Sequence, residues 1–489
     1  MPGVSVTTNV RSGPSAGAQP PSGQFFLVGV FERGSVTEAV RVRSVAELNR
    51  YFGNATSYSA GYDQAYTFFS EGGDQAYIAR VVGPDAATGQ LTLVDTVNDQ
   101  DNPATSLIVT AANPGKWSDN LTVEVVAGPT AGTYRMTLRL NGNIVEDYNN
   151  LTSPDDAVIR FNNSPYVVVT AGGSEAAAPD NNPKVQAATA LSGGDDKRDA
   201  ATSADYTAAL DLFVGSYGDG AVAIPGLSSP DVYTALTEHA KNNNRIALLG
   251  AENGASASNL KQAAAGVNTE FAGLFAPWVV IPGASVISNK EISPEGYVAA
   301  CRARAHAQVG PWRSPAGQFA QARYVVDVNH LFRSDEADDL DDARVSVIRK
   351  VSDSVRLYGW RSLSTDTDNW AYLKDRDTLN RITVASDNAL ERYVFEPIDG
   401  QGILQAQIAA ELTGILDPMA QAGGLYATFD ADGNEVDPGY LVDTSSAINP
   451  LSSLAQGIIN ATIAVRISPT ASLINLVITK VGLLASLTA

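Results

Sequence analysis

The chain has 489 residues, of which 44% are hydrophobic and 18% charged, a composition typical of a globular protein with about two to four domains. Its 53 acidic residues outnumber the 33 basic ones and give a formal charge of −20, which argues against a role in coating nucleic acid, because phosphate binding requires a positive surface. No run of about 18 apolar residues occurs, and Cys301 is the only cysteine, so we expect neither a membrane span nor an intramolecular disulfide. We expect a protein that is made and kept in a cytosol.

Residues 1–24 are predicted to form an extended arm. Val4, Val6 and Val10 stand between polar residues, a pattern typical of a half-buried strand. Glycine and proline then recur from Ser12 to Gly23, which favours a flexible linker over a packed element. A strand on such an arm cannot satisfy its own backbone donors and acceptors. It needs a sheet edge, and in an assembly that edge can belong to another subunit.

Residues 25–83 and 191–342 are predicted to form one α/β domain that an insertion interrupts. Strand and helix patterns alternate in both parts, and Ser44 and Glu47 form a capping box before a short helix. The acidic run at 335–342 is expected to be an exposed linker. The main predicted elements are the strands 25–30, 76–82, 221–224 and 245–249 and the helices 60–70, 204–212 and 231–242.

Residues 84–190 are predicted to form a β-rich module inserted into that domain. Helical periodicity is weak here, and asparagine, threonine, glycine and aspartate are frequent. Asn141, Gly142 and Asn143 separate two strand patterns and predict a hairpin turn. The predicted strands are 106–110, 121–126, 134–140, 144–148 and 166–170.

The remaining chain is predicted to form a C-terminal α+β domain, residues 343–457, followed by terminal strands at 458–489. Helices are expected near 371–380 and 404–420. Ile463, Val465 and Ile467 alternate with polar residues, so we expect a half-buried strand that seeks a sheet edge as the N-terminal arm does. The fold class is therefore α/β and α+β with several domains and an extended arm at each end.

The residues show no pattern of catalytic, metal or cofactor chemistry. His239, His306 and His330 are the only histidines, and none has a metal-ligand partner one helical turn away. A P-loop and a Gly-x-Ser-x-Gly elbow are missing from the sequence. The run from Asp430 to Glu435 resembles a calcium loop, but its glycine stands in the wrong place. We expect no enzyme, although residues of a Ser–His–acid set come together only in the fold.

Two tryptophan–arginine pairs leave core and interface roles open, because tryptophan and arginine serve both. These pairs are Trp312–Arg313 and Trp360–Arg361.

Several short stretches occur in an order and spacing that together are specific. They are Pro2–Val4, Val28–Gly34, Ala46–Gly53, Phe69–Val81, Pro114–Leu121, Ala276–Trp278, Gly310–Ala316, Gly359–Ser364, Phe395–Pro397 and Ile467–Pro469. The chain resembles the contractile tail sheath proteins of bacteriophages and related injection machines in these stretches, which span nearly its whole length. Two departures concern local contacts: Trp360 stands where the family usually has alanine, and Ala471 and Ser472 stand where it usually has an acidic residue.

The resemblance implies a structural subunit of a helical assembly. Sheath subunits form hexameric rings stacked around a rigid inner tube, and their metastable extended state contracts to drive the tube through a cell envelope without nucleotide hydrolysis. In such an assembly the arms of neighbouring subunits complete a sheet in the C-terminal domain of a third. The residues expected to exchange strands here are Val4, Val6, Val10, Ile463, Val465 and Ile467.

The resemblance also implies partners and a location. The partners would be further copies of the chain, the inner tube, and the baseplate and tail terminator proteins, with no nucleic acid, cofactor or membrane insertion. The place would be a virion tail sheath assembled in the cytoplasm of a host bacterium, and phages, bacteriocins and dedicated injection systems fit alike. The family lines its lumen with the C-terminal domain, so Lys374 and Arg376 are candidate tube contacts. The alternatives are a hydrolase-type α/β enzyme and a non-contractile virion protein.

Overall fold

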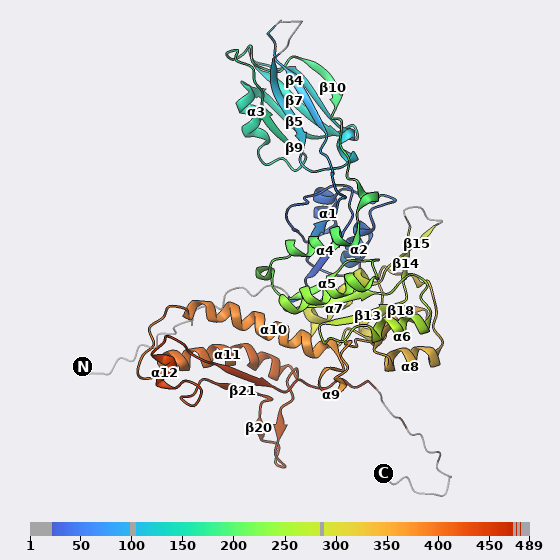
Figure 1. The fold of residues 1–489 in the computed structure, drawn as a ribbon, viewed down its shortest axis with the longest axis vertical. Coiled ribbons are helices and arrows are strands. Elements are labelled where there is room, and N and C mark those ends of the chain that lie inside the picture. The colour runs from blue at the N-terminus through green and yellow to red at the C-terminus, as the bar shows by residue number, and fades with distance from the viewer. Residues whose placement is uncertain (1–21, 98–103, 284–287, 473–475, 477–479, 481–489) are drawn as a thin grey trace, which may run out of the picture. The chain divides into compact units, whose positions relative to one another are not determined.

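The computed structural model describes the chain except for residues 1–21, 98–103, 284–287, 473–475, 477–479 and 481–489 (Figure 1). It divides into two compact units. The first unit comprises the residues up to 311 together with 315–385, and the second comprises 312–314 and 386–489. Helix α10 (Leu373–Leu390) begins in the first unit and ends in the second. None of the helices in the described residues is long and apolar enough to cross a membrane.

The first unit is built on an eight-stranded sheet with the order β18-β17-β13-β12-β11-β1-β3-β2. Its inner strands are parallel, and the edge strands β2 and β18 are antiparallel to their neighbours. Four inner strands, β1, β11, β12 and β13, are buried at every position, as expected for a sheet covered on both faces. The bounds are β1 Phe25–Gly29, β2 Val40–Val42, β3 Ala76–Arg80, β11 Gly220–Ala223, β12 Arg245–Gly250, β13 Ala272–Ala276, β17 Val345–Val351 and β18 Ser354–Leu357.

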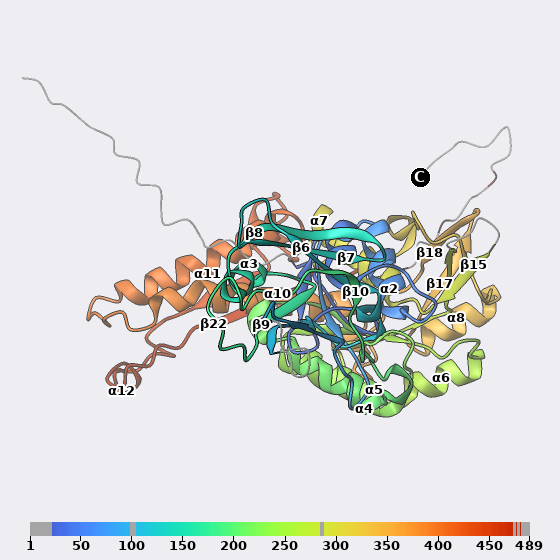
Figure 2. The ribbon, with the colours of Figure 1, turned by 90° about the horizontal axis from the view of Figure 1, so that it is seen from above.

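Helices cover both faces of this sheet (Figure 2). Side chains of β1 alternate between the two cores: Phe25 and Leu27 pack on one side, Phe26 and Val28 on the other. One core includes α1 (Val45–Phe52), α2 (Ala60–Ser70) and α7 (Glu295–Gln308), and the other includes α5 (Pro230–Asn242), α6 (Ala257–Ala265) and α8 (Ser334–Asp342). The other elements of this part are α4 (Ser203–Ala208), α9 (Thr367–Trp370), and a small sheet of β14 (Val279–Pro282), β15 (Asn289–Ile292) and β16 (Asp327–Val328).

The predicted α/β class is confirmed, and two details of the prediction are wrong. The acidic run is not a linker but helix α8, whose buried Ala337 and Leu340 lie three residues apart and face the core. The α/β part also does not end at residue 342, because β17 and β18 belong to the same sheet. Because most residues of this run are acidic, the two apolar residues that pack α8 against the core gave no clear helical signal in the sequence.

In its described residues the inserted module contains two antiparallel sheets, one α-helix and a 3-10 turn at Lys116–Asn120. One sheet contains β4 (Gln90–Val94), β5 (Thr105–Ala111) and β9 (Val167–Ala171); the other contains β10 (Gln186–Ala190), β6 (Leu121–Ala127), β7 (Tyr134–Leu140) and β8 (Asn143–Leu151). Asn141 and Gly142 both have positive φ, 50° and 81°, and form the predicted hairpin turn. Helix α3 (Pro154–Phe161) was not predicted. Its signals are the Ser153 cap, which accepts from the Asp156 amide, and Pro154 in the first turn.

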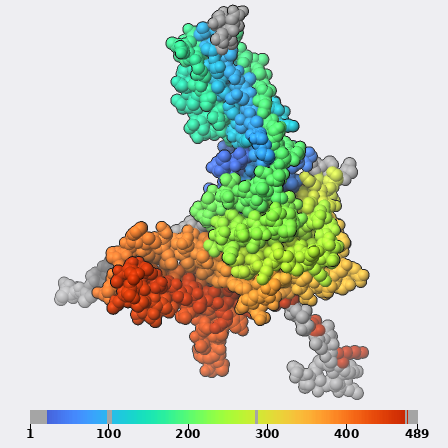
Figure 3. All heavy atoms as spheres, viewed as in Figure 1, coloured from blue at the N-terminus to red at the C-terminus, as the bar shows by residue number. Residues whose placement is uncertain are grey.

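The second unit contains α11 (Ile403–Gln421), α12 (Leu451–Leu454) and two small sheets of two strands. Leu404, Ile408 and Leu412 of α11 form its buried core, against which Val442 and Ile463 pack. The sheets are β19 (Thr428–Phe429) with β20 (Glu435–Asp437), and β21 (Tyr440–Asp443) with β22 (Thr462–Val465). The first of these hairpins projects from the body of the unit (Figure 3), and its Phe429 and Val436 are exposed.

Arg245, the first residue of β12, is fully buried at the amino end of this strand. Its guanidinium donates to the carbonyls of Phe213 (2.8 Å) and Val214 (2.8 Å) and pairs with His239 Nε2 (2.7 Å). Burial and the neighbouring positive charge of Arg245 lower the pKa of His239 to about 4. A neutral His239 can accept from Arg245, whereas a protonated one loses that bond and faces a like charge.

We therefore expect the first unit to lose stability in mild acid. Because the folded state holds the pKa of His239 below its unfolded value, the stabilisation is complete above pH 6.5 and is lost as pH falls towards 4, by up to about 3 kcal/mol. Urea unfolding of wild type and His239→Gln at pH 7 and pH 4.5 measures this. The drop on acidification should be smaller in the variant, with His330→Gln as control, and equal drops would contradict the assignment.

Candidate functional site

Four of the stretches that carry the family resemblance meet at the joint between the sheet and the inserted module: Val28–Gly34, Ala46–Gly53, Phe69–Val81 and Pro114–Leu121. Arg80, the last residue of β3, is buried and donates to four carbonyls: Phe31 (3.3 Å), Glu32 (3.4 Å), Gly34 (3.2 Å) and Pro114 (2.8 Å). The first three belong to the loop after β1, and Pro114 belongs to the module. One guanidinium therefore joins the sheet to the module through hydrogen bonds from a charged donor, which are stronger than neutral ones.

A second arginine closes the same joint. The Arg33 guanidinium lies over the rings of Tyr166 (4.8 Å) and Trp117 (5.8 Å), both in the module, and donates to the Asn49 carbonyl (2.9 Å). Gly115 has φ of 134°, and a Cβ there would lie 2.9 Å from Trp117, so the loop requires glycine. The stretch 114–121 is thus the docking loop of the module.

Residues 83–90 and 192–196 form two connectors that run side by side between the sheet and the module. Ala87 bridges Asp195, Gln90 bridges Ser192, and the Gly83 amide donates to the Asp196 carbonyl (2.8 Å). Together with the arginines, this pairing restricts the motion of the module relative to the sheet.

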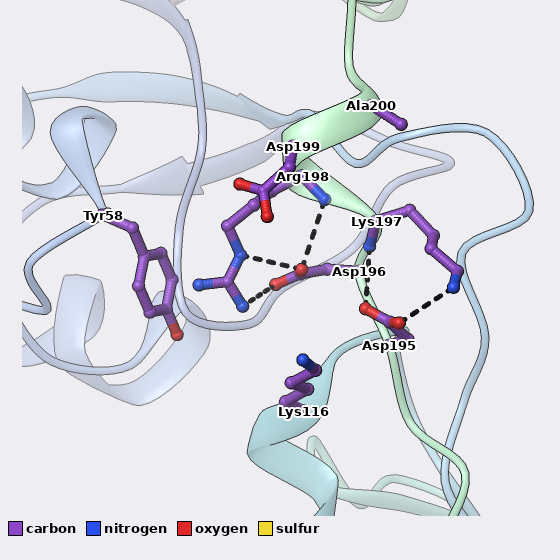
Figure 4. A pocket seen from close by; sticks show the side chains of 8 residues that line it. All are labelled: Tyr58, Lys116, Asp195, Asp196, Lys197, Arg198, Asp199 and Ala200. Carbon is purple, nitrogen blue, oxygen red and sulfur yellow. Dashed lines mark hydrogen bonds and ion pairs between the residues drawn. The ribbon is translucent and has the colours of Figure 1, made fainter.

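A polar hollow of about 420 Å³ lies beside the connectors (Figure 4). Four of the charged side chains that line it form two ion pairs, Arg198 with Asp196 (2.6 Å) and Lys197 with Asp195 (3.0 Å), and Lys116 and Asp199 also line it. The Arg198 guanidinium also covers the ring of Tyr58 at 3.4 Å. Because these paired charges neutralise one another, we interpret them as an ion-pair network that stabilises the joint. The described residues contain no group of three or more His, Cys, Asp or Glu that could hold a metal ion.

A second hollow, of about 270 Å³, lies where enzymes with this type of sheet bind ligands, outside the carboxyl ends of β1 and β11 at the point where the strand order reverses. Its wall contains Tyr58, Tyr206 and Trp278, with aliphatic residues and glycines between them. Among the described residues that line it, none is a histidine, cysteine or carboxylate.

Other residues of the resemblance form the core of the first unit. The buried Glu71 carboxylate accepts from the backbone amides of Arg323 (2.9 Å), Tyr324 (2.8 Å) and Val325 (2.9 Å) and pairs with Arg304 (3.1 Å). Trp360 is buried beside Phe275, so this tryptophan belongs to the core and not to an interface of the folded chain.

The C-terminal strand has a partner within its own chain. Ile463 pairs with Val442 and Val465 with Tyr440 in the β21–β22 ladder, and Ile467 bridges Leu425. The predicted alternation is confirmed, since these three side chains are half-buried while Thr462, Ala464 and Arg466 are exposed. The expectation that this strand lacks an edge in its own chain is wrong, because β21 supplies one. Val4, Val6 and Val10 lie outside the described residues.

The two candidate tube contacts differ in accessibility. The Lys374 side chain is 2% exposed, and its ammonium pairs with Asp375 (2.6 Å). Arg376 is partly exposed, lies over Phe271 (4.7 Å) and Trp370 (5.5 Å), and donates to Asn380 (2.9 Å). The tube contact stays a prediction, and of the two residues only Arg376 presents part of its surface.

Comparison with solved structures shows that the chain has the fold of contractile tail sheath proteins. The sheath tail protein of Listeria innocua superposes with a TM-score of 0.61 at 16% identity, over 87% of this chain and 89% of that one. The contracted helical sheath of the anti-feeding prophage gives 0.58 at 15% identity over 98% of both chains. The contracted sheath complex of the extracellular injection system PVC gives 0.56 at 14% identity, again over 98% of both. No family model and no curated protein matches the sequence.

Replacing Arg80 with lysine should loosen the joint. Lysine cannot reach four carbonyls from different directions, so buried acceptors lose their donor and the free energy of unfolding should fall by about 2 kcal/mol or more. Urea unfolding measures this loss, and limited proteolysis should show faster cutting in the connectors. Arg139→Lys is the control, because its pair with Glu124 is partly exposed and is worth about 1 kcal/mol or less. Equal losses in the two variants would show that Arg80 does not hold the module.

Proposed function

We propose that this chain is the subunit of a contractile sheath. The observation that carries the proposal is the likeness to two sheath proteins over 98% of both chains, including the inserted module and the second unit. In this proposal the chain forms hexameric rings stacked around an inner tube, and the extended stack contracts to drive the tube through a cell envelope. Its role is structural and not enzymatic. Its partners are the tube, baseplate and terminator proteins of a tail that assembles in a bacterial cytoplasm.

Strand exchange between subunits would hold the rings together. Within the described residues the β21–β22 sheet has only two strands, and such small sheets gain stability from added strands. The N-terminal arm, through Val4, Val6 and Val10, is proposed to add to this sheet in a neighbour. The strand with Ile463, Val465 and Ile467 can pair with β21 of its own chain or of a neighbour, because a donated β22 makes the same backbone bonds as a retained one.

The surface of the second unit supports an assembly role. Several large apolar side chains are exposed there, an arrangement that often marks a protein interface. They are Val394, Phe395, Ile403, Tyr426, Phe429, Val436, Leu441, Leu451 and Ile458. Phe395 is fully exposed and has φ of 70°, a strained conformation for an aromatic residue. Burial of these side chains against other subunits would offset the repulsion between copies that each carry a formal charge of −20.

Electron microscopy of the purified full-length chain tests the proposal. We expect tubes or stacked rings that increase with salt, because screening reduces the repulsion between acidic subunits. A chain lacking residues 1–19 should stay a folded monomer, since its core is intact while its arm is missing. Single particles of the full-length chain in every salt condition would count against the sheath, and normal tubes from the shortened chain would count against strand exchange.

The tube contact is tested separately at α10. Arg376→Gln should weaken co-assembly with the inner tube protein while self-assembly of the sheath continues, because only a partly exposed charge is removed. Lys374→Gln should instead lower the melting temperature, since its ammonium is buried beside Asp375. The control is Lys241→Gln on the exposed surface of α5. Co-sedimentation with tubes measures the effect, and an unchanged yield for Arg376→Gln would remove this residue from the contact.

A further inference from the structure

Ser22 is the first residue that the structure describes, and a buried cluster holds it. The Ser22 carbonyl accepts from Arg302 Nη1 (2.6 Å), and its hydroxyl bonds His306 Nδ1 (3.1 Å). Arg302 and His306 lie one turn apart on α7, and both bind Asp377 of α10: Arg302 Nε at 2.8 Å and His306 Nε2 at 3.1 Å. All three side chains are at most 2% exposed.

The protonation states give each bond of the cluster a direction. Burial alone would raise the pKa of Asp377, but Arg302 and His306 hold it at about 2, so this group is a carboxylate and only accepts. Burial and the charge of Arg302 lower the pKa of His306, which is therefore neutral at pH 7. With its one proton on Nε2, facing Asp377, the imidazole accepts at Nδ1 from the Ser22 hydroxyl.

The next two residues are also held in place. A Cβ on Gly23 would lie 3.2 Å from Ala303 Cα, so the chain packs directly on the backbone of α7. Gln24 donates to the Tyr217 (2.7 Å) and Asp219 (3.2 Å) carbonyls, and accepts from the Gln75 side chain (2.7 Å). Strand β1, in the middle of the sheet, begins at the next residue, Phe25. A pull on the arm would thus act on the central strand unless this segment took the load first.

We propose that Arg302, His306 and Asp377 form a clamp that fixes the position of Ser22, where the N-terminal arm joins the first unit. In an assembled sheath the clamp would also transmit tension on the arm into α7 and α10, and this load-bearing part rests on the proposed sheath function. These three are positioning residues, because they act on the arm through Ser22. The bidentate Arg302–Asp377 pair suits this task, since water is excluded from it and two parallel bonds resist shear together.

The positioning part is tested on the folded monomer with a spin label at Pro21→Cys. Cys301 is buried, and burial raises the pKa of its thiol to about 12, so the label should attach only at the new cysteine. Adding Gly23→Val should lift the segment off Ala303 and shorten the rotational correlation time of the label severalfold. The matched control is Gly173→Val, where an added Cβ meets nothing within 4 Å. Label motion that Gly23→Val leaves unchanged would overturn the clamp.

Melting temperatures show whether each variant is folded. Should Gly23→Val fail to fold, Ser22→Ala decides the question, because it removes only the hydroxyl that His306 binds and leaves the buried ion pair intact. Labelled at Pro21→Cys, Ser22→Ala should also give a more mobile label than its parent. Equal mobility in Ser22→Ala and its parent would likewise overturn the clamp.

The load-bearing part is tested on polymers. Tubes of Gly23→Val should form but break up at a urea concentration that Gly173→Val tubes survive, as followed by sedimentation and electron microscopy. Equal urea midpoints would overturn the load-bearing role while leaving the label result standing. If the full-length chain makes no tubes at all, the proposed function fails, and label mobility in the monomer still decides whether the clamp exists.

Discussion

Buried arginines connect the central sheet of the first unit to the segments attached to it. A guanidinium in an apolar interior is tolerated only when its donors find acceptors, so each such residue fixes several backbone segments at once. Arg80 binds the module through Pro114, Arg302 binds Ser22 just before β1, and Arg304 binds Glu71. The parallel strands supply a rigid frame, and these polar contacts determine where the attached parts leave it.

The sequence predicts the frame well and these connections poorly. Fully apolar strands, capped helices and the Asn141–Gly142 turn have local signals, and the structure has all of them. An arginine in the sequence does not indicate whether its side chain is exposed or buried, because arginine occurs both on surfaces and in buried pairs. Family resemblance drew attention to the stretches that contain Arg33, Arg80 and Trp117, but spacing along the chain could not show that they meet in one joint.

The C-terminal strand shows a second limit of sequence reasoning. Period-two alternation states which side chains of a strand are buried, and Ile463, Val465 and Ile467 follow it. It does not state which strand lies beside them or to which chain that strand belongs. Lys374 shows the same limit for helices: a charged residue near a helix start predicts exposure, yet tertiary packing places its ammonium in the interior beside Asp375.

Pairing of β22 within its own chain also constrains the energetics of the proposed assembly. If a neighbour donated β22, each backbone bond gained would replace an equal one lost, so the exchange itself would contribute little net free energy. The driving force would have to come from arm strands added to an open edge and from burial of apolar side chains such as Leu441 and Phe395. Such terms are short-ranged, whereas repulsion between the acidic subunits acts over the screening length of the solution. In the proposed assembly, short-range contacts would therefore hold a subunit to its neighbours, and the salt concentration would set the range of the opposing repulsion.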